Sequence, residues 1–245
     1  MSYDGIGADE LRALLHVPRL ALYDEVSSTL DVAHRLAAEG APAGTLVLAD
    51  QQHAGRGRLG RRWESAPGAG IWLTLIERPS DPDAIRVLSL RLGLHAARAL
   101  DRYTPSVVRL KWPNDLYVRD GKLAGILVET RWRDERIDWV AIGFGLNVRR
   151  PENVPRSAAL EASSQRAAVL ATLVPALRTA AASRGVLSAA EIDGFAERDM
   201  ARGRPCREPA RGIVQGIDAR GALVIRTDGG TVTQTSGSLV LEDDT

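Results

Sequence analysis

The chain has 245 residues, of which 44% are hydrophobic, and its formal net charge is +1 at pH 7. This length can bury a sizeable core in one domain, or in one domain and a smaller second one. A net charge near zero argues against a protein that binds nucleic acid or an anionic membrane through its overall electrostatic field. The one cysteine, Cys206, leaves no internal disulfide framework and is typical of a reducing cytoplasm.

The start of the chain predicts a short helix at residues 9–16 and no secretion signal. Residues 1–12 contain no basic stretch followed by an apolar run, and no apolar run in the chain is long enough to span a bilayer. The segment leaves no room for a helix-turn-helix domain before the rest of the fold. We therefore expect a cytoplasmic protein that binds neither DNA nor membrane.

Caps and periodicity predict the elements that follow. A helix should begin near Ser28, with Asp31 in capping-box position, and should end at Gly40. Hydrophobic spacing and turn residues predict the remaining elements. These are strands at 45–49, 71–76, 107–110, 115–118, 123–130 and from 139 through 142 into 148, and helices over 85–103, 164–183 and 189–199. Apolar segments at 213–214, 223–225 and 239–241 between Gly-rich turns predict a small antiparallel, barrel-like unit.

An Arg- and Gly-rich loop lies between two of the predicted strands. The nine residues from Gly55 to Trp63 contain three glycines and four arginines. Glycine lets the backbone approach a ligand closely, and guanidinium groups bind carboxylates or phosphates in a bidentate manner. The loop could therefore close over a nucleotide phosphate or a small carboxylate, with Trp63 packing on a base or in the core. A flexible RNA-binding stretch and an ordinary solvated loop are the alternatives.

The chain uses lysine at two positions only, Lys111 and Lys122, among 32 basic residues. Lysine is a compact point charge on a flexible stem, whereas arginine is a rigid planar fork. Lys111 begins Lys-Trp-Pro-Asn-Asp, in which Asn114 and Asp115 add an amide and a carboxylate at a turn. Lys122 directly precedes the strand predicted at 123–130, which contains Gly125. An ordinary turn and compositional drift are the alternative explanations.

Other common catalytic patterns are missing from the sequence. The four histidines are scattered without partner spacing, so we assign them no metal or base role. Cys206 is interpreted as a packed thiol. The sequence contains no paired-cysteine metal site, no Walker phosphate loop and no dinucleotide-binding glycine pattern.

Four motifs in order resemble those of the biotin protein ligases: Gly-Arg-Gly-Arg-x-Gly-Arg-x-Trp, Lys-Trp-Pro-Asn-Asp, Gly-Lys-Leu-Ala-Gly-Ile-Leu-Val-Glu and Gly-x-Gly-Leu-Asn-Val. The likeness is strong over about residues 20–150 and extends in length and character to the C-terminal part. The group without an N-terminal DNA-binding domain is the better match. The resemblance implies an α+β fold, with a mixed β-sheet catalytic domain and flanking helices (residues 1–200, class II synthetase-like or biotin–lipoate ligase fold) and a small C-terminal SH3-like β-barrel (residues 203–245).

The same resemblance implies an activity and assigns residues to it. Such a ligase joins biotin and ATP, with Mg²⁺, into biotinyl-5′-AMP, and then transfers biotin to one lysine of a biotin carboxyl carrier protein or domain, as a monomer or homodimer. The resemblance implies that Lys122, Arg58 and Asp115 are catalytic. It places Ser28, Thr29, Gln52, Gly55, Arg56, Lys122 and Gly125 on biotin, and Arg58, Arg61, Trp63, Lys111, Asn114 and Asn147 on ATP, with no protein-bound metal.

One position departs from the family pattern. Leu30 follows Ser28-Thr29 where the family usually has asparagine, so one amide contact near biotin is absent. Two other functions stay open at this point. A lipoate or octanoyl ligase or transferase would share the fold and the lysine-centred chemistry, and a nucleic-acid-binding module would use the arginines on phosphates. The two motifs at 55–63 and 111–115 argue against the first, and the net charge argues against the second.

Overall fold

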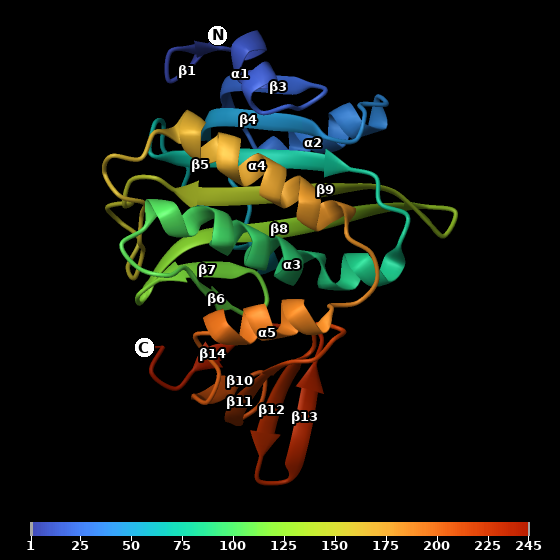
Figure 1. The fold of residues 1–245 in the computed structure, drawn as a ribbon, viewed down its shortest axis with the longest axis vertical. Coiled ribbons are helices and arrows are strands. Elements are labelled where there is room, and N and C mark those ends of the chain that lie inside the picture. Colours follow the sequence, from blue (N-terminus) through green and yellow to red (C-terminus); the bar gives the residue numbers. More distant parts are fainter. Residues whose placement is uncertain (1, 245) are drawn as a thin grey trace.

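The computed structural model describes residues 2–244. A seven-stranded sheet forms its centre, in the order β3-β4-β5-β9-β8-β7-β6 (Figure 1). The first two strands pair in parallel and all other neighbours pair antiparallel. Its strands are β3 (Leu20–Val26), β4 (Thr45–Gln52), β5 (Gly70–Glu77), β6 (Arg109–Lys111), β7 (Asp115–Val118), β8 (Gly121–Arg133) and β9 (Arg136–Asn147).

Helices cover both faces of this sheet. The helix α3 (Pro82–Leu100) contacts β8 and packs against α4 (Arg166–Ala182), which contacts β5 on the same face (Figure 1). The shorter α2 (Thr29–Ala38) packs on β4, β5 and β9 from the other face. Because β5 and the part of β9 from Trp139 to Leu146 are covered on both faces, they are largely buried, and their sequences are mostly apolar instead of alternating between apolar and polar residues.

A five-stranded antiparallel sheet follows at the C-terminal end, in the order β13-β12-β11-β10-β14. It hangs below α5 (Ala189–Arg198) in Figure 1. The buried indole Nε1 of Trp112 donates to the carbonyl of Gly221 at 3.0 Å, which ties this sheet to the segment that follows β6. Its strands are β10 (Pro205–Glu208), β11 (Gly212–Ile217), β12 (Leu223–Thr227), β13 (Gly230–Gln234) and β14 (Val240–Leu241).

Most of the expected elements are present, with shifted ends. The α+β class and the antiparallel C-terminal unit are confirmed, and the short N-terminal helix is α1 (Ala8–Leu14). The strand expected at 107–110 lies at 109–111. The sequence did not predict the edge strand β3 or four shorter strands. The four are β1 (Ser2–Tyr3), β2 (Ile6–Gly7), β10 and β13.

The expected capping box at the start of α2 is wrong. Ser28 occupies the N-cap position with extended backbone, but its side chain makes no capping hydrogen bond. Asp31 instead accepts from Ser27 and pairs with Arg56 at 3.0 Å. The end of the helix is as expected, because Gly40 has a φ of +89° directly after it.

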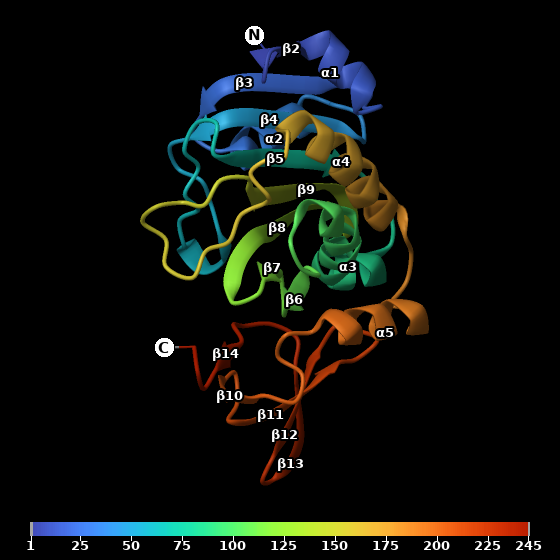
Figure 2. The ribbon, with the colours of Figure 1, turned by 60° about the vertical axis from the view of Figure 1, so that its left-hand side comes forward.

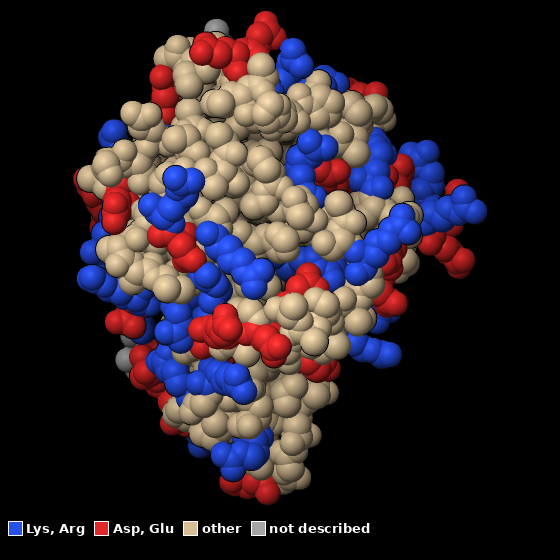
Figure 3. Space-filling model, in the orientation of Figure 1, with Lys and Arg blue, Asp and Glu red and all other residues tan. Residues whose placement is uncertain are grey.

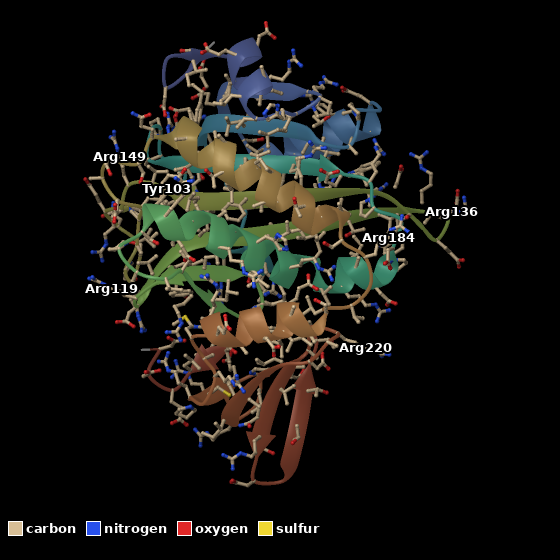
Figure 4. The ribbon with its side chains drawn as sticks, in the orientation of Figure 1. Tyr103, Arg119, Arg136, Arg149, Arg184 and Arg220 are labelled. Atoms are coloured by element: carbon tan, nitrogen blue, oxygen red, sulfur yellow. The ribbon has the colours of Figure 1, made fainter. Side chains whose placement is uncertain are left out.

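Charged side chains of both signs lie on the visible face of the molecule (Figure 3). Figure 3 shows basic and acidic side chains interspersed on this face, in keeping with a net charge of +1. Within residues 2–244, no helix is both long and apolar enough to cross a membrane. In Figure 4, Arg136 marks the far tip of the β8–β9 hairpin and Arg149 lies just beyond the other end of β9.

We expect Glu191→Gln to lower the free energy of unfolding at neutral pH by about 2 kcal/mol, because it removes the charge from a hydrogen-bonded ion pair. Arg91, with a side chain only 1% exposed, donates to both oxygens of Glu191 and to the carbonyl of Val186. Urea unfolding measures the loss. Glu197→Gln, exposed on the same helix, is the matched control and should change little.

The same variant should flatten the acid limb of stability. Burial alone would raise the pKa of Glu191, but the hydrogen bonds from Arg91 and Ser188 outweigh it and lower the pKa from 4.5 to about 2. A carboxylate with a lower pKa in the folded state stabilises fully above pH 4.5, and this stabilisation is lost as the pH falls toward 2. Equal pH slopes for wild type and variant in this window would contradict the assignment.

Candidate active site

A cavity of about 340 Å³ lies against β8 and β9 and is the place where the sequence motifs meet. Two segments that follow β4 and β9 border it, and Figure 2 shows both projecting from the same side of the sheet. The lining includes every site residue expected from the sequence except Gly55. These residues are Ser28, Thr29, Gln52, Arg56, Arg58, Arg61, Trp63, Lys111, Asn114, Asp115, Lys122, Gly125 and Asn147.

Two facing glycines form the middle of the cavity floor. Gly125 of β8 and Gly145 of β9 are cross-strand partners, and the indole of Trp63 lies over both. A Cβ on Gly145 would lie 2.6 Å from Trp63 Nε1, and one on Gly125 would lie 2.9 Å from Trp63 Cζ3. Both distances are impossible for real atoms, so glycine is required at each position for the indole to lie there.

The strand β9 gives the cavity two ends. Gly143 faces the start of α2, while Asn147, four residues on, faces the segment that follows Lys122. Four residues of extended strand span about 13 Å, so the two ends are separate binding regions. We call them the α2 end and the Asn147 end.

Hydroxyl and amide groups are concentrated at the α2 end. The side-chain oxygen of Gln52 accepts from the backbone N–H and the hydroxyl of Thr29, at 2.9 and 3.1 Å, and Thr74 donates to that hydroxyl at 2.9 Å. Gln52 in turn donates to Ser65. The hydroxyl of Ser28 is buried and has no hydrogen-bond partner among residues 2–244, so a polar ligand group could satisfy it.

Leu30 makes the α2 end more apolar next to Gly143. Its side chain is 3% exposed and belongs to a small core with Ala33, Val47 and Ala141. It also reaches the cavity, where it lies 3.2 Å from the position that a Cβ on Gly143 would take. A hydrocarbon surface therefore occupies the place of the amide expected from the family pattern.

An ion pair of Lys122 with Asp115 lies at the centre of the site. The ammonium nitrogen is 2.8 Å from Oδ1 of the carboxylate and 5.3 Å from the centre of the Trp63 ring. Oδ1 is buried but receives no directed hydrogen bond from residues 2–244, so it keeps the capacity to accept one. The pair therefore places a cation and a buried carboxylate oxygen together beside the glycine floor.

Arg58 reaches the same centre from the glycine-rich loop. It donates to the side-chain oxygen of Asn114 at 3.3 Å, while the Asn114 amide nitrogen donates to the Ile126 carbonyl at 2.8 Å. Burial lowers the pKa of Arg58, the charge of Asp115 raises it, and the charge of Arg61 lowers it again. A guanidinium in this position is partly desolvated and gains from a nearby anion.

Arg56 holds the beginning of the loop against the protein. It pairs with Asp31 at 3.0 Å and with Glu129 at 3.1 Å. Glu129 also contacts His34 Nε2 at 2.7 Å. The loop conformation is thus fixed by carboxylates from α2 and β8. Gly55 lies just behind it, where a Cβ would meet the Trp63 carbonyl at 2.5 Å, so its role here is in the loop's own packing.

The Asn147 end is built from parts of the chain that lie far apart in sequence. Asn147 donates to the carbonyls of Lys122 and Ala158, and Lys111 reaches the lining from β6. Ser238 and Leu239, which directly precede β14, also line the cavity. Sequence reasoning missed these two residues, because no local pattern indicates that a segment so distant along the chain contributes to the cavity.

Comparisons with known proteins agree with this architecture. The profile described as "Biotin/lipoate A/B protein ligase family" matches residues 23–147, about half of the chain, and "Biotin protein ligase C terminal domain" matches residues 206–241. The chain therefore belongs to the biotin/lipoate A/B protein ligase family. A solved structure of the biotin protein ligase from Aquifex aeolicus in complex with biotin and ATP superposes with a TM-score of 0.76, at 27% identity over 92% of this chain and 99% of that one.

Two curated relatives show how far the similarity extends. The biotin–[acetyl-CoA-carboxylase] ligase of Mycobacterium tuberculosis is 31% identical over 87% of this chain and 85% of its own length. The bifunctional ligase/repressor BirA of Bacillus subtilis is 40% identical over 55% of this chain and 42% of its own. The chain thus spans less than half the length of the second relative.

We expect Gly145→Ala to destabilise the protein by about 1–3 kcal/mol, as overpacking of a filled site does. The nearest atoms to the new methyl group all belong to Trp63. In a Trp63→Ala background the cost should therefore largely vanish, and urea unfolding of the four proteins measures this coupling. An equal cost in both backgrounds would show that the glycine does not serve the indole. Gly93→Ala, whose methyl group would have ordinary contacts from 3.5 Å, is the control.

Proposed function

We propose that this chain is an ATP-dependent biotin protein ligase, which activates biotin as biotinyl-5′-AMP and transfers it to a lysine of a biotin carboxyl carrier protein or domain. The observation that carries the proposal is the Lys122–Asp115 pair between two differently built ends of one cavity. In this proposal residues 1–200 form the catalytic domain and residues 203–245 the small C-terminal domain.

The α2 end suits biotin. A ureido ring offers two N–H donors and one carbonyl acceptor, and this end presents the unsatisfied Ser28 hydroxyl together with Thr29 and Gln52. The hydrocarbon part of the ligand would lie along the floor at Gly125, near Leu30. A ligand here would supply the hydrogen-bond partner that the Ser28 hydroxyl lacks, so a polar group would be recognised inside a largely apolar pocket.

The activation step joins two anions, so cations must offset their repulsion. A carboxylate oxygen of biotin attacks the α-phosphorus of ATP, the bond to the bridging oxygen of the β-phosphate breaks, and pyrophosphate leaves. We place Lys122 between the carboxylate and the α-phosphate, and Arg58 on the phosphate side. Arg56 would complete the anion-binding loop over the biotin end, and Gly55 would let the start of that loop pack closely against Trp63.

The transfer step needs a neutral amine. The ε-nitrogen of the acceptor lysine attacks the acyl carbon, AMP leaves, and an amide forms. Asp115 is assigned to receive the proton or to orient the amine, because its buried Oδ1, in contact with the Lys122 ammonium group, can accept a further hydrogen bond. Lys122, next to it, would stabilise the leaving phosphate.

The Asn147 end is assigned to the nucleotide. The side-chain amide nitrogens of Asn114 and Asn147 donate to backbone carbonyls, which fixes the orientation of their side-chain oxygens toward the proposed nucleotide position. Lys111 and Arg61 would bind phosphates, and Trp63 would wall the nucleotide. Mg²⁺, which favours phosphate oxygens and water, would enter with ATP as part of the substrate.

The proposal places the enzyme in the cytoplasm as a monomer or homodimer that binds no DNA. The one cysteine, Cys206, is a free buried thiol, in keeping with a reducing compartment.

The proposed function is tested by incubating the chain with biotin, MgATP and a biotin carrier domain, and then weighing the carrier. We expect the mass of one biotinyl group on the carrier, and none on a carrier whose acceptor lysine is replaced by arginine. Lipoate in place of biotin should give no product. A carrier modified by lipoate and not by biotin would assign the other activity of this family.

We expect Lys122→Arg to slow biotin-dependent release of pyrophosphate by tenfold or more, because the planar guanidinium would misplace the charge between carboxylate and phosphate. Tenfold corresponds to about 1.4 kcal/mol of transition-state stabilisation. Thermal unfolding should stay unchanged, which shows that the fold survives. Arg119→Lys, outside the site, is the control, and a rate for Lys122→Arg equal to that of wild type would refute the role given to Lys122.

A further inference from the structure

A carboxylate from the C-terminal segment lies against the proposed nucleotide-binding lysine. Asp244 Oδ2 is 2.5 Å from the ammonium nitrogen of Lys111 and accepts from the backbone N–H of Leu241 at 3.1 Å. Its other oxygen is 3.6 Å from Arg156. Both side chains of the main pair are largely covered, since Lys111 is 11% and Asp244 18% exposed.

The two cations that Asp244 contacts come from separate segments of the chain. Lys111 ends β6, whereas Arg156 belongs to the segment between β9 and α4. The carbonyl of Arg156 accepts from the backbone N–H of Lys122 at 2.7 Å, so this segment is attached to the strand that carries the central lysine. Asp244 therefore links β6 to the segment that follows β9, and each of these two segments contributes residues to the cavity lining.

The charge state of Asp244 fits an anion held by these cations. Burial raises its pKa, but the hydrogen bond from Lys111, the Leu241 N–H and the charges of Lys111 and Arg156 outweigh burial and hold the pKa below its ordinary value. A carboxylate oxygen and a phosphate oxygen make the same kind of charge-assisted hydrogen bond to an ammonium group. Asp244 thus has the chemistry of the ligand that the proposed function places on Lys111.

We propose that Asp244 determines the affinity for ATP, because its carboxylate occupies the phosphate position on Lys111 and must leave before the nucleotide binds there. This inference rests on the proposed function, which assigns Lys111 to ATP. Lys111 is too covered to receive a phosphate beside Asp244, and the two anions would repel each other. Nucleotide binding therefore includes the cost of displacing the C-terminal segment, which lowers the apparent affinity.

The test compares Asp244→Asn with Asp243→Asn. The first removes the charge with little change in shape, and the second does the same at the neighbouring, mostly exposed carboxylate that pairs with Arg204. Titration calorimetry measures the Kd for ATP and for biotin separately. We expect Asp244→Asn to bind ATP at least about fivefold more tightly, a typical coupling between linked groups. Its Kd for biotin and both values for Asp243→Asn should match wild type.

A role in which Asp244 only orients Lys111 gives the opposite sign. In that case Asp244→Asn would bind ATP more weakly, or would lower kcat with an unchanged KM for ATP, and either result overturns the proposal. An unchanged Kd overturns it as well. A second measurement needs no variant: ATP should increase amide exchange at Leu241, whose N–H is held by Asp244, and continued protection would count against displacement.

The outcomes also separate this inference from the proposed function. If wild type binds ATP but biotin gives no pyrophosphate release, the ligase activity fails while the comparison of Kd values still decides the role of Asp244. If neither wild type nor Asp244→Asn binds ATP, both proposals fall.

Discussion

The pairing of β8 with β9 at Gly125 and Gly145 is the constraint on which the site depends. Because neither residue has a side chain, the Trp63 indole can lie directly on the sheet. The same strand then fixes what stands on either side of this floor, with Asn147 toward one end of the cavity and Gly143 toward the other. A slip of one residue would turn these side chains to the opposite face and remove the cavity.

Three cations of the site are each paired with a carboxylate of the protein. Arg56 is held by Glu129, Lys122 by Asp115 and Lys111 by a carboxylate of the C-terminal segment. These partners come from different elements, so the ion pairs also connect the loop, the sheet and the C-terminal segment. An incoming anion would meet positioned cations whose internal partners it has to replace, and this exchange links ligand binding to the arrangement of the surrounding segments.

Local sequence was sufficient to predict some elements of the fold and of the site, and insufficient to predict others. The long helix α3 follows from apolar spacing, although it begins at Pro82 and not at residue 85, and the meeting of the lysine and arginine motifs follows from the family resemblance. The capping box at Ser28 failed because tertiary contacts took over: the Asp31 carboxylate pairs with Arg56 instead. The edge strand β3 and the contribution of Leu239 were invisible, since each depends on partners distant in the chain.

We infer that one ligand spans the glycine floor, with its acyl part at the α2 end, its nucleotide at the Asn147 end and the reacting atoms beside Lys122. A crystal structure with a non-hydrolysable analogue of biotinyl-5′-AMP tests this most directly. We expect the ureido ring at Ser28, the link between acyl group and phosphate within hydrogen-bonding distance of the Lys122 ammonium group, and the phosphate where Arg58 can reach it. An analogue bound in the reverse direction, or away from Gly125 and Gly145, would contradict this arrangement of the ligand.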